Sequence, residues 1–403
     1  MSAKRGDSIR GRLYYPKEFE EQEIGSKGYI ERWAVETLVN EYFVCKAKGT
    51  KRLDTRKWAV FATLMNRLRA YENADSLSDI EEGAILHALP RLLWRQMPWQ
   101  NGICNAQSLY RSWYIYNFDE ASEYFLRLHG ISIPRFAEIG FIIYALTHEN
   151  PAVDVSLSLG ELNITKLEFE RFISIVADNV PNIRRYAATL RMGPGQSAYK
   201  ASILRKYPII VHGAKKKVLA YAPMPDLVMQ RVSDGLFFDV VGNGELRRLC
   251  SHRFEEYVRV ILSHYCPENM TVSPEFVTSY GSSSDFYLSC DGRVSIIGEC
   301  KARRLNMSVR QSPNPSVLDD MQSVYEELAK GVKQIWRTHS VIRTRKTDTN
   351  ISLSESGVLG IVVTLDPWFI LDRATVEKAF SIASKLDTRK NPMILAWPFR
   401  SSR

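Results

Sequence analysis

The stretch Ser282–Lys301, SSSDFYLSCDGRVSIIGECK, predicts a β-hairpin that organises the C-terminal half of this chain. Asp285–Ser289 has the composition of a short strand, and Val294–Cys300 has that of a returning strand. The turn between them contains Asp291-Gly292, a pair typical of two-residue hairpin loops. Because side chains alternate along a strand, we expect two faces on the returning strand: Val294, Ile296, Gly298 and Cys300 on one, and Ser295, Ile297, Glu299 and Lys301 on the other.

Three polar residues of this hairpin form a candidate active site. Glu299 and Lys301 share a face at the end of an apolar strand, and Asp285 begins the partner strand. Carboxylate oxygens suit hard divalent cations, and a neighbouring lysine can orient a water or stabilise charge on a phosphate. Open α/β sheets bind ligands at such strand ends. The pattern therefore predicts metal-assisted phosphate chemistry; the alternatives are a turn role for Asp285 and a surface ion pair between Glu299 and Lys301.

This arrangement resembles the motif of the PD-(D/E)XK nuclease superfamily, with Asp285 first, then a hairpin, and then Glu299-Cys300-Lys301. One position departs from the family pattern, because Ser284 stands where the family often has proline. The resemblance implies a restriction-endonuclease-like α/β fold with a mixed central sheet flanked by helices, and Mg²⁺-dependent DNA hydrolysis with Mn²⁺ as a substitute. It also implies that Asp285, Glu299 and the backbone carbonyl of Cys300 bind the metal, while Lys301 orients or activates the attacking water.

The segments around the hairpin follow the order that the resemblance implies. Arg253–His264 has helical spacing, with Glu255 at the border of its apolar stripe and Glu256 on the opposite side. We therefore expect Glu255 to be a further catalytic carboxylate of the site, in the helix that the resemblance places before the hairpin. A helix at Val317–Arg337 and a buried strand at Gly357–Leu365 are expected after the hairpin. The residues expected to contact nucleic acid are Arg303, Arg304, Lys330, Lys333 and Gln334.

The charge of the chain favours a polyanionic partner. The 403 residues carry a formal net charge of +9. Lys301–Lys346, directly after the motif, contains ten basic and four acidic residues. Beside a carboxylate cluster of this type, such an excess indicates phosphate binding, and double-stranded DNA is the expected partner. The alternative is a solvated helix face with a basic loop.

We expect a mostly α-helical N-terminal domain over residues 1–195 and a nuclease-like domain over residues 196–403, with the boundary in Arg191–Ser197. Pro208–His212 and Val218–Ala222 predict a second hairpin. Leu157–Val176 has a weak helix-turn-helix pattern with Asn163 at the turn, for which an ordinary helical bundle is the favoured alternative. Helical spacing in the N-terminal half covers Ile30–Phe43, Trp58–Tyr71, Ile80–Arg95, Phe118–Leu128, Ile133–His148 and Lys166–Asp178.

Other functional classes lack their signatures in this sequence. The six cysteines form no CxxC pair and no zinc spacing, and no run reaches the length of a membrane helix. We therefore expect a cytoplasmic protein without a membrane partner. We hypothesise that the chain is a metal-dependent DNA endonuclease, and by analogy we expect it to act in antiviral defence. It would act alone, as a homodimer or with a partner protein. The alternatives are an inactive nuclease-like protein for nucleic-acid binding or assembly, and an RNA-cleaving nuclease.

Overall fold

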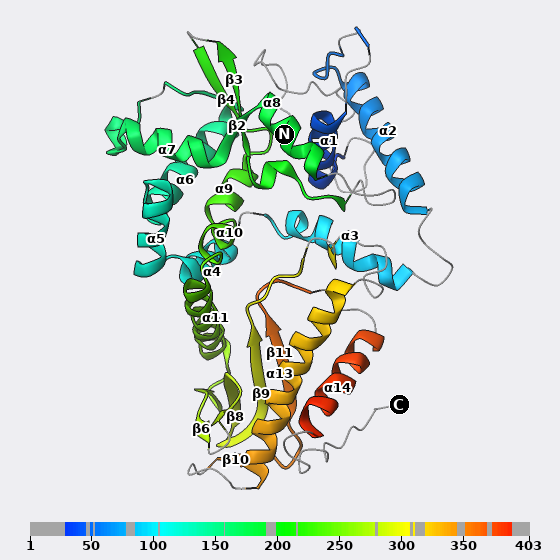
Figure 1. Ribbon diagram of the computed structural model, residues 1–403, viewed down its shortest axis with the longest axis vertical. Helices are drawn as coiled ribbons and strands as arrows, with labels where there is room; N and C mark the ends of the chain where they lie inside the picture. The colour runs from blue at the N-terminus through cyan, green and yellow to red at the C-terminus, as the bar shows by residue number, and fades with distance from the viewer. Residues whose placement is uncertain are drawn as a thin grey trace. The chain divides into compact units, whose positions relative to one another are not determined.

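The computed structural model describes residues 29–45, 49–50, 53–77, 85–103, 105–156, 158–190, 199–214, 217–278, 281–306, 309–310, 319–344, 351–368 and 373–388. The chain has mixed α/β content, with helices dominating the N-terminal half and mixed sheets with flanking helices following (Figure 1). It divides into two compact units, residues 1–82 with 91–246, and residues 83–90 with 247–403. Residues 196–246, expected in the C-terminal domain, fall in unit 1.

Unit 1 is a helical unit completed by a small sheet. Its strand order is β1-β4-β3-β2, in which the predicted hairpin of β3 and β4 pairs with two short strands that the sequence did not reveal. This pairing joins the hairpin to the N-terminal half and accounts for its place in unit 1. The strands are β1 (Ala152–Asp154), β2 (Ala177–Asn179), β3 (Ile209–Ala214) and β4 (Lys217–Tyr221).

The six helices expected in the N-terminal half are all present, and the structure adds α4 and α8. The longer helices are α1 (Arg32–Val44), α2 (Trp58–Leu77), α3 (Ile85–Gln100), α4 (Ala106–Tyr116), α5 (Asp119–His129), α6 (Ile133–Glu149), α7 (Lys166–Val176) and α8 (Val180–Thr189), followed by the short α9 (Asp226–Val232) and α10 (Leu236–Val240). Among the described residues, no single helix is long and apolar enough to cross a membrane. The pair α5 and α6 meets those criteria only jointly, and it is bent by 70°.

The helix-turn-helix interpretation of Leu157–Val176 is wrong. Only α7 is an α-helix in this stretch, and a short 3₁₀ turn over Gly160–Leu162 stands where a first helix would be needed. Asn163 does turn the chain, since its φ of 55° is left-handed. Thr165 and Glu168 then form a capping box that begins α7. A recognition helix needs a packed partner helix before it, and the described residues of this stretch provide none.

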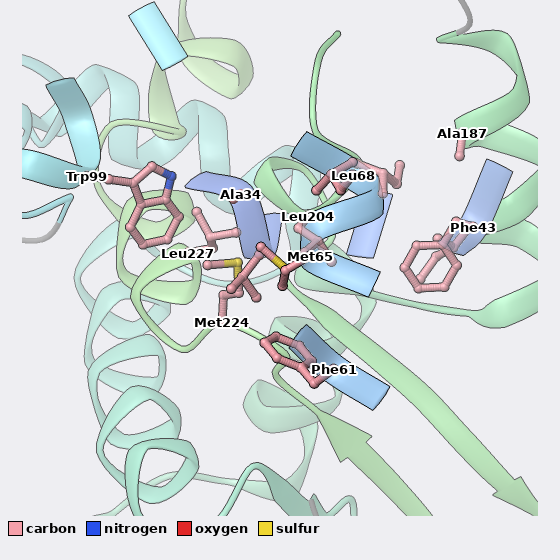
Figure 2. Packing of buried hydrophobic residues seen from close by; sticks show 13 residues of the cluster. Ala34, Phe43, Phe61, Met65, Leu68, Trp99, Ala187, Leu204, Met224 and Leu227 are labelled. Carbon is pink, nitrogen blue, oxygen red and sulfur yellow. The ribbon is translucent and has the colours of Figure 1, made fainter. Parts of the chain in front are cut away.

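A buried apolar cluster holds unit 1 together (Figure 2). It joins Phe61 and Met65 of α2 to Ala34 and Phe43 of α1, and it continues to Leu204, which precedes β3 in the chain. These side chains are 6% exposed or less. The cluster therefore connects α1 and α2 with segments more than a hundred residues away in the sequence.

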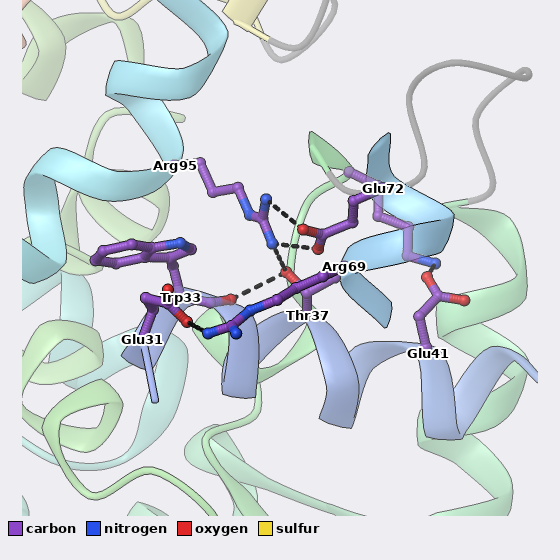
Figure 3. A network of polar contacts seen from close by, with 8 residues as sticks. Glu31, Trp33, Thr37, Glu41, Arg69, Glu72 and Arg95 are labelled. Carbon is purple, nitrogen blue, oxygen red and sulfur yellow. Dashed lines mark hydrogen bonds and ion pairs between the residues drawn. The ribbon is translucent and has the colours of Figure 1, made fainter. Parts of the chain in front are cut away.

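A polar network lies beside this cluster (Figure 3). The Arg95 guanidinium donates to the carboxylate of Glu72 and, over 3.0 Å, to Thr37 Oγ1, which in turn donates to the Trp33 carbonyl over 3.0 Å. Figure 3 also shows the ion pair of Glu31, the N-cap residue of α1, with Arg69, and that of Glu41 of α1 with Lys200. Buried polar groups cost free energy unless they are paired, so this network specifies how α1, α2 and α3 pack.

Unit 2 is built on a mixed sheet of order β10-β9-β8-β5, with β11 also paired to β9. β5, β8 and β9 are antiparallel, whereas β10 and β11 run parallel to β9. α13 packs on β9 and β11, and α14 packs on α13 (Figure 1). The elements are α11 (Gly244–Tyr265), β5 (Met270–Pro274), β6 (Val277–Thr278), β7 (Gly281–Ser282), β8 (Phe286–Cys290), β9 (Arg293–Lys301), α13 (Asp319–Arg343), β10 (Ser352–Leu353), β11 (Leu359–Thr364) and α14 (Arg373–Thr388).

The predicted hairpin Ser282–Lys301 is confirmed, and its turn has the expected chemistry. Cys290 pairs with Arg293, so that only Asp291 and Gly292 form the loop. Their φ angles of 49° and 76° are both positive, as a type I′ turn requires.

The predicted grouping of side chains on β9 is partly wrong. Leu288 pairs with Ile296 but Ser289 pairs with Val294, so β9 carries an extra residue in a β-bulge. The bulge inverts the alternation, and Val294 joins Ile297 in one apolar cluster with Ile335 and Ile342 of α13. Ser295 is the unpaired residue of the bulge, whereas Ile297, Glu299 and Lys301 lie beyond it and keep the expected alternation.

Gly298 is required by a close approach within the hairpin. It pairs with Phe286, whose side chain is 2% exposed, and a Cβ at position 298 would lie 2.0 Å from the Phe286 ring. We expect Gly298→Ala to lower the free energy of unfolding by about 1–3 kcal/mol, because the ring must move within a packed core. Urea unfolding measures this loss, with Gly244→Ala as the control, since a Cβ there meets nothing within 4 Å. A Gly298→Ala protein as stable as the wild type would contradict this packing.

Candidate functional site

Asp285 lies at the entrance to β8, directly opposite Glu299. Phe286 pairs with Gly298, and continuing this antiparallel register by one residue places Asp285 beside Glu299 on the same face. The Asp285 carboxylate is fixed there, because its Oδ2 accepts a hydrogen bond from the Cys300 N–H over 2.6 Å. In a strand the N–H and C=O of one residue point to the same side, so the Cys300 carbonyl is also directed toward Asp285.

Glu299 and Lys301 form an ion pair on the face of β9 that α13 covers. Lys301 Nζ donates to Glu299 Oε1 over 2.8 Å, and the two side chains are 16% and 6% exposed. Gly331 of α13 lies above both, since a Cβ there would be 3.4 Å from Lys301 Cε and 3.5 Å from Glu299 Cγ. Glu299 Oε2 is buried and has no hydrogen-bond partner in the part of the chain that the structure describes. One carboxylate oxygen of the predicted site is therefore left for a further ligand.

The electrostatics of the site raise the pKa of two carboxyls. Burial, the largest cause, raises the pKa of Glu299 to about 7; the charges of Asp285 and Glu255 add to this, while Lys301 opposes it. Burial also raises the pKa of Asp285, and the Cys300 N–H and the Lys301 charge oppose that change. Carboxyls this close resist ionising together, and a bound cation would relieve their repulsion.

Glu255 of α11 belongs to the same electrostatic cluster. Burial and the charge of Asp285 raise its pKa, while His252, whose Nδ1 is 3.3 Å from Glu255 Oε2, opposes that change. Glu256 is more exposed than Glu255, with side-chain values of 37% and 24%. The helix pattern thus distinguished the two glutamates correctly.

The structure adds Glu275, which the sequence did not indicate. It is exposed in the connection after β5, and its charge raises the pKa of both Asp285 and Glu255. No motif or periodicity marked it, because its proximity to Asp285 arises from the pairing of β5 with β8.

The five residues expected to contact nucleic acid all make contacts within unit 2. Arg303 donates to Ser323 Oγ over 3.0 Å, and Arg304 lies 3.5 Å from Asp366, which also pairs with Arg310. Lys330 pairs with Glu327 over 2.9 Å, Lys333 donates to the Leu386 carbonyl, and Gln334 donates to the Ser283 carbonyl.

The side chains of these residues differ in exposure. Arg304 is only 8% exposed, whereas Arg303 and Lys330 are 38% and 58% exposed. Arg303 and Lys330 are thus the members of the set best placed to reach a phosphate. Arg345 and Lys346, at the end of the basic stretch, lie outside the described residues.

The donor set for a metal is incomplete in side chains alone. Among the described residues, no three His, Cys, Asp or Glu side chains are arranged to hold a metal ion together. The hard donors at the site are the carboxylates of Asp285 and Glu299 and the Cys300 carbonyl, and such sites keep water or substrate oxygens as further ligands. The chemistry of these donors and the unpartnered Glu299 Oε2 fit Mg²⁺ or Mn²⁺.

Comparisons with protein-family models, with curated proteins and with solved structures find no significant match to this chain.

Proposed function

We propose that this protein is a metal-dependent nuclease and that unit 2 has the restriction-endonuclease-like fold. The observation that carries the proposal is the meeting of Asp285, Glu299 and Lys301 at one end of the β8–β9 hairpin, where one buried oxygen of Glu299 has no partner among the described residues. The element order of unit 2 supports it, since the helix α11 precedes the β8–β9 hairpin, and the helix α13 and the parallel strand β11 follow it.

In the proposed reaction, Asp285, Glu299 and the Cys300 carbonyl would hold Mg²⁺ or Mn²⁺. A divalent cation bound there would stabilise charge on the phosphate and lower the pKa of a bound water. The Asp285 carboxylate needs little reorganisation, because the Cys300 N–H already fixes it. Lys301 is held by Glu299 within the site, where its ammonium orients water and stabilises the charge that develops on the phosphate.

The charge of the chain supports DNA as the substrate. Its net charge of +9 attracts a polyanion, and Arg303 and Lys330 supply exposed cations in the segment after the motif. Two alternatives remain as outcomes of the test, cleavage of RNA and binding without cleavage. The second is favoured by one observation, the lack of three metal-binding side chains in one group among the described residues.

The test is a nicking assay on supercoiled plasmid with Mg²⁺, an EDTA control, and Asp285→Asn beside the wild type. We expect Asp285→Asn to reduce nicking by about 10²–10³-fold while the protein still binds DNA, because a neutral amide removes charge from the cation site and leaves the basic residues in place. A parallel assay on labelled RNA separates the two substrates. If Asp285→Asn nicks the plasmid as fast as the wild type does, this site is excluded. If the wild type binds DNA or RNA tightly and cleaves neither, the alternative of binding without cleavage is favoured.

A further inference from the structure

The segment directly before Asp285 is buried and fixed by α13. Ser284 and Thr338 are 1% and 2% exposed. The Ser284 N–H donates to Thr338 Oγ1 over 2.7 Å, and the two hydroxyl oxygens lie 3.1 Å apart. These contacts join residues that are 54 positions apart in the sequence, so they are a property of the tertiary structure.

Gln334 holds the preceding residue from the same helix. Its Nε2 donates to the Ser283 carbonyl over 3.0 Å, and Ser283 Oγ accepts from the Phe276 N–H over 2.9 Å. Gln334 and Thr338 are four residues apart and therefore share one face of α13. Two consecutive residues are thus hydrogen-bonded to one helix immediately before Asp285, whose carboxylate is bound to β9 on its other side.

We propose that Gln334 and Thr338 are positioning residues for the Asp285 carboxylate, a role that rests on the nuclease function proposed above. A proline before the aspartate would restrict the backbone through its ring, because the ring fixes φ. Ser284 occupies that position here, and its buried hydrogen bonds to Thr338 provide the restriction instead. Gln334, which the sequence suggested as a contact to nucleic acid, then acts through Ser283 and Asp285.

The test uses the Cys300 amide as a reporter, because its N–H donates to the Asp285 carboxylate. Hydrogen exchange is compared in the wild type, in Thr338→Val, which removes the acceptor of the Ser284 N–H, and in Thr338→Ser, which retains a hydroxyl. Thr147→Val is the matched control, since Thr147 is 3% exposed and its hydroxyl donates to carbonyls of its own helix, α6. Amides of β9 before Gly298 serve as the internal reference.

We expect Cys300 exchange to accelerate about tenfold in Thr338→Val, because the loss of one buried hydrogen bond frees the segment that holds Asp285. In Thr338→Ser and in Thr147→Val, the Cys300 amide should exchange at the wild-type rate. An unchanged rate in Thr338→Val, an equal acceleration at the reference amides, or equal effects of the valine and serine variants would each overturn the proposal.

A kinetic measurement separates this proposal from the nuclease function. If the protein cleaves DNA, Thr338→Val should lower kcat at unchanged KM, because Asp285 acts on the reaction and the DNA contacts are intact. The exchange measurement needs no activity. If the wild type cleaves no nucleic acid but Thr338→Val still accelerates exchange of the Cys300 amide, the result supports the positioning role and contradicts the proposed nuclease function.

Discussion

Glu299→Gln is expected to reduce Mg²⁺-dependent nicking by about 10²–10³-fold, because it removes a charge from the cation site while keeping the shape of the side chain. Glu299 is the central residue of the proposed site: its side chain is 6% exposed, it pairs with Lys301, and its Oε2 is unpartnered among the described residues. Glu256→Gln is the matched control, since Glu256 lies on the more exposed side of α11. Wild-type activity in Glu299→Gln would exclude the proposed mechanism.

The same substitution should change how stability depends on pH. The pKa of Glu299 is raised to about 7 from an ordinary value of 4.5, so between these values the folded protein binds more protons than the unfolded chain. The free energy of unfolding therefore falls as pH rises from 4.5 to 7, by about 3 kcal/mol from this residue. In Glu299→Gln this fall should disappear, and the metal-free protein should be more stable than the wild type at pH 8. Urea unfolding in EDTA across this range measures both effects, and identical pH profiles would contradict the burial of an ionisable Glu299.

Glu36→Ala should be among the most destabilising substitutions in unit 1, and we expect it to lower the free energy of unfolding by about 3–5 kcal/mol. The Glu36 carboxylate accepts two hydrogen bonds from Arg205, over 2.8 and 3.0 Å, and one from Trp99 Nε1 over 2.8 Å. Burial alone would raise the pKa of Glu36, but Arg205 and Trp99 together hold it below its ordinary value. Alanine leaves the Arg205 charge and the Trp99 N–H without this partner beside the apolar cluster of Figure 2.

The measurement is chemical unfolding of Glu36→Ala beside Glu170→Ala. Glu170 forms an exposed ion pair with Lys166, whose side chains are 57% and 89% exposed, and its loss should cost less than about 1 kcal/mol. The contribution of Glu36 should also be lost as pH falls below 4.5, because its pKa is lowered in the folded state. A loss below about 1 kcal/mol in Glu36→Ala would mean that this network does not hold α1 in place.

Local features of the fold were predictable because their causes are local. Asp291-Gly292 specifies a turn through positive φ angles at adjacent residues, and the prediction is confirmed. Periodic apolar residues likewise located the six expected helices of the N-terminal half. The short strands β1 and β2 were missed, because three residues carry too little pattern and each forms only by pairing with a distant strand.

The sequence by itself determined the hairpin, its turn, and the placement of Asp285, Glu299 and Lys301 at one strand end, since alternation and turn chemistry act between neighbours. Only the tertiary structure decided the bulge that moves Val294 to the other face, the burial of Arg304 against Asp366, and the proximity of Glu275 to Asp285. It also decided the raised pKa of Glu299, because burial beneath α13 and the charges of Glu255 and Asp285 come from segments that meet only after folding.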